Sequence, residues 1–213
     1  MTELRPPVAP GEPAPDFTLP AVDRPESVSL ADYRGRNPLF LSLLSGLWCP
    51  FCRRTIAHMG AMESRLKEVG VQTLGVVATT PENARLYFKY RPTQLRLGSD
   101  PELSTHRAYG VGKLAPEHAN ALETTRINPF GDLPEPLPAM EVAMVIAKAD
   151  GYAETPTDKA DMERQWPQLK AQFLIDRAGI VRWANIEAAK EGAAGVGKFP
   201  SAEEVIAAAK ALR

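Results

Sequence analysis

The chain contains only two cysteines, Cys49 and Cys52, in the segment Trp48-Cys49-Pro50-Phe51-Cys52. The segment follows an apolar run at residues 39–44, typical of a buried strand, and precedes an amphipathic helical pattern. We therefore expect Cys49 at a helix N-terminus, where unpaired N–H groups and the helix dipole favour a thiolate. Cys52 falls one turn into the helix, close enough to form a disulfide, and Pro50 takes an early helical position where its missing N–H costs little.

The two cysteines could also form a structural disulfide or part of a zinc site. A structural disulfide would close so short a loop that it stabilises the fold by only about 2 kcal/mol, and such bonds do not persist in the cytosol. A zinc site would need two more ligands, and His58, His106 and His118 lack the spacing of a zinc finger, so we expect no metal. Redox chemistry is favoured, with Trp48 and Arg53 as supporting residues.

The composition excludes several partner classes. The 213 residues are 44% hydrophobic, and 25 basic against 26 acidic side chains give a net charge of −1. No run of five like charges is present, so neither nucleic acid nor an anionic membrane is an expected partner. The sequence begins without an apolar signal-like segment, and residues 38–51 are too short and too interrupted to span a bilayer. We expect a cytoplasmic protein.

The remaining patterns predict the elements that position the cysteines. Five prolines make residues 1–15 an extended, mobile arm, followed by a single domain over residues 16–213. Hairpins are predicted from residues 17–19 with 28–30 and from 173–175 with 180–183, buried strands at 39–44 and 71–77, and a helix at 52–69 ended by Gly70.

Capping signals mark further helices. Thr80-Pro81-Glu82 predicts a helix start, Asp100-Pro101-Glu102 repeats that signal, and Ser201 with Glu204 predicts the start of the last helix. Residues 111–169 are interrupted by prolines, and only 139–149 has a helical pattern, so we interpret them as an insertion.

Five motifs in order resemble a known family: Ala14-Pro15-Asp16-Phe17-Thr18-Leu19, Leu30-x-Asp32-Tyr33-Arg34-Gly35, Trp48-Cys49-Pro50-Phe51-Cys52, Gly98-Ser99-Asp100-Pro101, and the strand from Phe173 to Val181. The set is similar to the peroxiredoxin-like branch of the alkyl hydroperoxide reductase and thiol-specific antioxidant (AhpC/TSA) family. The resemblance implies an α/β thioredoxin-like fold, with a central mixed sheet flanked by helices, an N-terminal hairpin extension and the insertion at about 111–169.

The resemblance also implies roles. It makes Cys49 the nucleophile that attacks peroxide and Cys52 the resolving thiol that closes a disulfide. Lys170 stands where peroxiredoxins hold an arginine, while Gly46 and Ser42 replace the usual threonine or serine and proline before the nucleophile. These departures predict slow peroxide turnover, because a lysine lacks the fixed donor fork of arginine.

The implied partners are a peroxide or disulfide substrate and a thioredoxin- or glutathione-type reductant, with no cofactor beyond the redox disulfide; a homodimer is compatible with the family. Two alternatives stay open. The Cys-Pro-Phe-Cys segment also suits a thiol–disulfide reductase of thioredoxin or glutaredoxin type, and the insertion could belong to a redox-sensing module without enzymatic activity.

Overall fold

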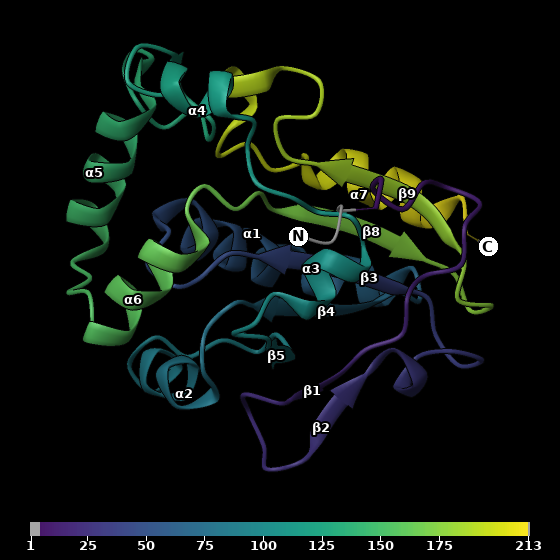
Figure 1. The fold of residues 1–213 in the computed structure, drawn as a ribbon. Coiled ribbons are helices and arrows are strands. Elements are labelled where there is room, and N and C mark those ends of the chain that lie inside the picture. The colour runs from purple at the N-terminus through teal and green to yellow at the C-terminus, as the bar shows by residue number, and fades with distance from the viewer. Residues whose placement is uncertain (1–4, 213) are drawn as a thin grey trace.

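The computed structural model describes residues 5–212, which fold around a five-stranded mixed sheet with the strand order β5-β4-β3-β8-β9 (Figure 1). β3 runs parallel to β4, β4 parallel to β5, and β8 antiparallel to both β3 and β9. The strands are β3 (Leu39–Leu44), β4 (Gln72–Val77), β5 (Leu97–Ser99), β8 (Ala171–Ile175) and β9 (Val181–Ile186). The prediction of a thioredoxin-like mixed sheet is confirmed, as is the β8–β9 hairpin.

Alternating side chains of β3 supply both layers of the core. Leu39, Leu41 and Leu43 pack with the N-terminal hairpin and the region of α3 (Ser104–Ala108), whereas Phe40 and Leu44 pack on the opposite face. That opposite face is covered by α1 (Pro50–Glu68) and α7 (Ala202–Lys210). Because β3 is central and buried on both faces, the loop that follows it is held by the most rigid part of the molecule.

Local signals set the helix ends much as predicted. α1 begins at Pro50 with Cys49 as its N-cap, as the Cys-Pro-Phe-Cys segment predicts and two residues before the apolar helical pattern starts at Cys52. The chain leaves α1 through Gly70 at a φ of +80°. Thr80 caps α2 (Pro81–Tyr90) and Ser201 caps α7, each accepting a backbone N–H with its side chain. The prediction of a helix start at Asp100 is wrong: α3 begins at Ser104. The Asp100 carboxylate instead accepts the backbone N–H groups of Ser104 and Thr105, in the first turn of α3.

The N-terminal segment is extended, as predicted, but it is packed rather than mobile. Val8 is buried, and its N–H donates to the carbonyl of Tyr109 at 3.1 Å. Gly11 and Glu12 exchange backbone hydrogen bonds with Val181 of β9. Prolines fix the extended conformation of the segment, which pairs with β9 because β9 is an edge strand with free backbone groups. Residues 1–4 of the predicted arm lie outside the described residues. The predicted hairpin follows as β1 (Thr18–Pro20) and β2 (Ser27–Ser29), and a short 3₁₀ turn, Leu30–Asp32, comes next.

The predicted insertion contains more helix than its prolines suggested. It holds α4 (Pro116–Ala121), the two-residue strands β6 (Arg126–Ile127) and β7 (Leu137–Pro138), α5 (Ala139–Asp150) and α6 (Pro156–Gln165). α4 was missed because Pro116 was interpreted as a break, although proline is favoured at the first helical position. α6 was missed because its sequence contains few apolar residues and so shows no helical pattern. Figure 1 shows α4, α5 and α6 gathered at one end of the sheet, the end where α1 begins. A second 3₁₀ turn, Gly192–Gly195, precedes α7, and no helix within residues 5–212 has the length and apolarity needed to cross a membrane.

Candidate active site

The two cysteines meet at the junction of the β3 loop with α1. Cys49 is the N-cap of α1, and its sulfur accepts the N–H of Cys52 at 3.3 Å. The two cysteines approach to 3.2 Å without a disulfide bond. Cys52 is fully buried, and its Sγ lies 2.9 Å from Ser45 Oγ, while Cys49 retains 8% exposure. The arrangement lets an incoming substrate reach Cys49 first.

The two thiols have opposite acidities. Burial raises the pKa of Cys49, but a hydrogen bond from Cys52 and the positive charge of Lys170 outweigh it and bring the pKa to about 7, against the opposing charge of Glu187. The pKa of Cys52 is raised well above its ordinary value, first by burial and then by its hydrogen bond and charge interaction with Cys49. Near neutral pH, about half of Cys49 is thiolate, and Cys52 is the proton-bearing thiol beside it.

Lys170 lies one residue before β8 with only 1% of its surface exposed, and its Nζ is 5.7 Å from the ring centre of Phe51, which stands between the two cysteines in the sequence. Its Nζ forms an ion pair of 2.9 Å with Glu187 Oε1. Glu187 is in turn fixed by the backbone N–H groups of Lys170 and Gly197, at 2.9 and 2.7 Å. The buried pair therefore presents a fixed positive charge to the sulfurs, while its carboxylate keeps the charge balanced.

No room exists at Gly46 for the hydroxyl that peroxiredoxin-like motifs place three residues before the nucleophile. A Cβ built on Gly46 would meet the indole of Trp48 at 2.4 Å and the amide oxygen of Gln165 at 3.0 Å. Trp48, predicted as a supporting residue, is buried and donates its indole N–H to the same oxygen at 2.9 Å. The indole and the amide fill the space that a threonine side chain would need.

Arg53 supports the site through its hydrogen bonds and packing rather than through a net positive charge. Its guanidinium is buried, donates to the carbonyls of Leu47 and Trp48 at 2.8 and 3.3 Å, and pairs with Asp150 of α5 at 3.2 Å. It also stacks over Tyr152, 4.6 Å from the ring centre. Arg53 therefore holds the loop before Cys49 against the inserted helices, and its charge is matched by Asp150.

Cys49 opens into a cavity of about 210 Å³ whose lining is mostly apolar. Pro50 and Phe51 form the side nearest the cysteine, and the insertion supplies most of the opposite wall. Three of its lining side chains are exposed methionines: Met140 and Met144 of α5 and Met162 of α6. Methionine is flexible and polarizable, so this wall can adapt to apolar groups of different shapes.

The histidines considered as zinc ligands are not brought to the cysteines. His58 packs against Phe130 at 5.1 Å between ring centres, His106 is fully buried in α3, and His118 lies against Gly192. Within residues 5–212, no three or more His, Cys, Asp or Glu residues gather as a metal site would require.

Three residues of the site, Ser45, Glu187 and Gln165, and the three methionines of the cavity wall were not identified from the sequence. Ser45 contacts Cys52, seven residues on, and Glu187 pairs with Lys170, seventeen residues before it, but neither belongs to a recognisable local pattern. Gln165 ends a helix whose start had a readable signal, since Thr155 and Asp158 form a capping box around Pro156. Even so, the inward direction of Gln165 depends on how α6 packs.

A comparison with protein families matches residues 10–184 to the AhpC/TSA family. Among curated proteins, the thiol–disulfide oxidoreductase ResA of Halalkalibacterium halodurans is 27% identical over 139 residues, covering 59% of this chain and 77% of that protein. The family match spans both cysteines, the hairpin and strands β3 to β8, with Lys170 included.

Solved structures share the fold at low identity. The peroxidoxin BcpB of Mycobacterium tuberculosis superimposes with a TM-score of 0.60 at 14% identity, covering 97% of this chain and 99% of that one. A reduced 2-Cys peroxiredoxin of Plasmodium vivax gives 0.62 at 18% identity, covering 97% and 82%. The expected resemblance is confirmed by the family match, and the chain is a member of the AhpC/TSA family of thioredoxin-like oxidoreductases.

Proposed function

We propose that the protein is a dithiol oxidoreductase that reduces disulfides through Cys49, with Cys52 as the resolving thiol. The observation that carries the proposal is the pair itself: an N-cap thiol with a pKa of about 7, 3.2 Å from a buried, protonated partner. The similarity to a protein named as a thiol–disulfide oxidoreductase supports it.

The electrons and protons balance in two steps. The Cys49 thiolate attacks one sulfur of the substrate disulfide, forms a mixed disulfide and expels the other sulfur as a thiolate. Cys52 then loses its proton and attacks Cys49 Sγ, which expels the second substrate sulfur as a thiolate. That proton, together with the one that Cys49 released to the solvent when it ionised, protonates the two departing thiolates. The substrate is reduced to two thiols, the protein holds a Cys49–Cys52 disulfide, and an external thioredoxin- or glutathione-type reductant reopens it.

Peroxide reduction, the function that the sequence favoured first, is the second candidate. In that reaction Cys49 attacks the O–O bond, water or an alcohol leaves, and Cys52 condenses with the resulting sulfenic acid to release water. The mostly apolar cavity at Cys49 favours this candidate, because an organic hydroperoxide would fit it. The filled space at Gly46 argues for a slow reaction, since an oriented donor to the transition state is typically worth about 10²- to 10³-fold in rate.

Reduction of insulin disulfides and consumption of an alkyl hydroperoxide, measured on the same preparation with dithiothreitol as reductant, test the proposal. We expect insulin reduction that Cys49→Ser abolishes, and a slower peroxide reaction that depends on the same residue. Peroxide turnover faster than insulin reduction would reverse the order of the two candidates. Activity in neither assay would contradict the proposal and favour a redox-sensing module. A cytoplasmic location remains part of this proposal.

A further inference from the structure

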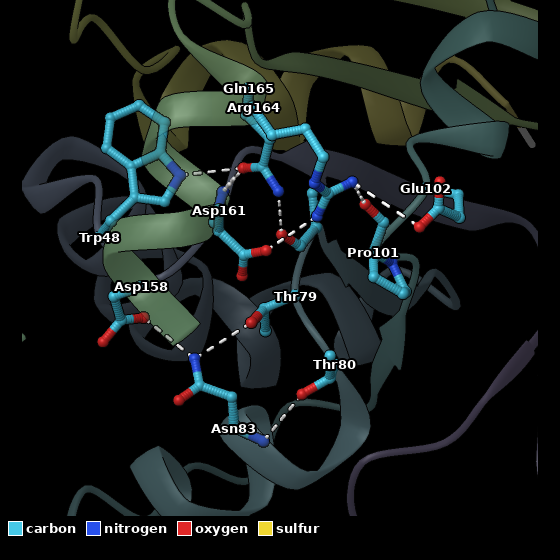
Figure 2. Close-up of polar contacts among 12 residues, drawn as sticks. Trp48, Thr79, Thr80, Asn83, Pro101, Glu102, Asp158, Asp161, Arg164 and Gln165 are labelled. Carbon is cyan, nitrogen blue, oxygen red and sulfur yellow. Dashed lines mark hydrogen bonds and ion pairs between the residues drawn. The ribbon is translucent and has the colours of Figure 1, made fainter. Parts of the chain in front are cut away.

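The inference starts from the way α6 is attached to the domain. The inward face of α6 is polar: Asp158, Asp161 and Gln165 are spaced three and four residues apart and are at most 4% exposed. Figure 2 shows that their contacts differ. Asp158 accepts a hydrogen bond from Asn83 of α2 at 2.9 Å, whereas Asp161 pairs with Arg164 of α6 itself at 2.8 Å. Neither of these contacts involves the loop at residues 45–48.

Gln165 alone among the three binds the loop before the nucleophile. Its Oε1 accepts the backbone N–H of Gly46 and the indole N–H of Trp48, both at 2.9 Å, and its amide nitrogen donates to the carbonyl of Ala78, just after β4 (Figure 2). The carbonyl of Gly46 accepts the N–H of Cys49 at 3.1 Å. A single residue, Gly46, therefore connects the amide of Gln165 to the backbone of Cys49.

The contact of Gln165 with Gly46 and Trp48 is tightly packed. Residues 45–48 belong to neither β3 nor α1, so side-chain contacts must fix their conformation. A single added methyl at Gly46 would collide with Trp48 and press on Gln165. Trp48 in turn stacks edge to face with Trp166, the residue after Gln165, with ring centres 6.0 Å apart. Both tryptophans line the cavity at Cys49.

We propose that Gln165 is a positioning residue for Cys49. Its side-chain amide holds the loop at residues 45–48, including the indole of Trp48 that lines the cavity, in a fixed position relative to the end of β4. The inserted helix α6 is thereby part of the active site although none of its residues reacts. This role rests on the proposed function, but it concerns the geometry of Cys49 and can be measured without any turnover.

The experiment compares Gln165→Met, which removes all three hydrogen bonds at similar length, with Gln165→Asn, which stays polar but is one methylene too short. Asp161→Asn is the matched control, because it alters the same face of α6 without touching the loop. Each reduced protein is alkylated with iodoacetamide between pH 5 and 10, and modification of Cys49 is quantified by mass spectrometry. Equilibrium unfolding establishes that each variant is folded.

A displaced Cys49 loses alignment with the Cys52 N–H and with Lys170, so the midpoint of its alkylation profile rises. We expect a rise of at least half a pH unit in both Gln165 variants, equivalent to about threefold slower alkylation below the midpoint, and an unchanged midpoint in Asp161→Asn. If Gln165→Met does not fold, Gln165→Asn decides alone.

Unchanged midpoints in folded Gln165 variants, or an equal rise in Asp161→Asn, would overturn the positioning role. Because alkylation needs no substrate disulfide or peroxide, this outcome is independent of the insulin and peroxide assays. Inactive native protein in those assays would contradict the proposed function while leaving the alkylation result meaningful.

Discussion

Lys170→Met removes the buried positive charge that stabilises the thiolate, and it should therefore raise the pKa of Cys49. The native pKa of about 7 lies two units below the ordinary 9.0, a preference for the thiolate of about 2.7 kcal/mol. At pH 7 the native Cys49 is about half ionised, and a pKa one unit higher would leave about a tenth as thiolate. We therefore expect a rise of at least one unit and alkylation at pH 7 slowed about fivefold or more.

The control variant separates charge from packing. Lys170→Met leaves the Glu187 carboxylate buried without its partner, which raises the pKa of Cys49 further and destabilises the fold by about 3 to 5 kcal/mol. The double variant with Glu187→Gln removes both charges and keeps an acceptor for one of the N–H groups of Lys170 and Gly197, which donate to different oxygens of Glu187. In the double variant, the pKa of Cys49 should lie between its values in the native protein and in the single variant. A folded Lys170→Met protein whose Cys49 still titrates near pH 7 would refute the role of Lys170.

Further outcomes follow from the same contacts. Cys52→Ser should accumulate a mixed disulfide at Cys49 that is detectable by mass spectrometry, whereas Cys49→Ser should form none; turnover by the latter would reverse the assigned roles. Insulin reduction should rise with pH through about 7 and then level off, because the thiolate of Cys49 is the reacting form; a rate that falls across this range would exclude it. Arg53→Met should lower the free energy of unfolding by about 1 to 3 kcal/mol in urea titrations, since it leaves the buried carbonyl of Leu47 without its donor and leaves Asp150 paired with Arg54 alone; a loss under 1 kcal/mol would contradict the role of Arg53 in holding the loop. Asp158→Ala should cost about 2 to 4 kcal/mol in the same titration, because Asp158 caps α6 and accepts from Asn83 and Tyr152; an unchanged midpoint would show that α6 is held by other contacts.

Local chemistry made much of the fold predictable from the sequence. The apolar run of β3 and the helical spacing after Cys52 depend on neighbours a few residues away, as do the caps at Thr80 and Ser201. The exceptions have identifiable reasons. Helix α4 was missed because Pro116 was interpreted as a break rather than as a first helical residue, and α6 because it contains too few apolar residues to show a helical pattern. The packing of the N-terminal segment was not predicted, because its pairing with β9 connects residues about 170 positions apart.

The sequence by itself determined the position of the two cysteines at the start of a helix, with Cys49 at the end that favours a thiolate, because this follows from a spacing of three residues and a capping position. Only the tertiary structure decided what surrounds them. The partner of Lys170 is Glu187, just after β9 and across a hairpin, and the loop at Gly46 is held by Gln165, more than a hundred residues away. Such contacts form when distant segments pack together, so no local pattern encodes them. The chain's type of chemistry is therefore local, whereas the acidity of its thiols and the shape of its cavity are properties of the assembled fold.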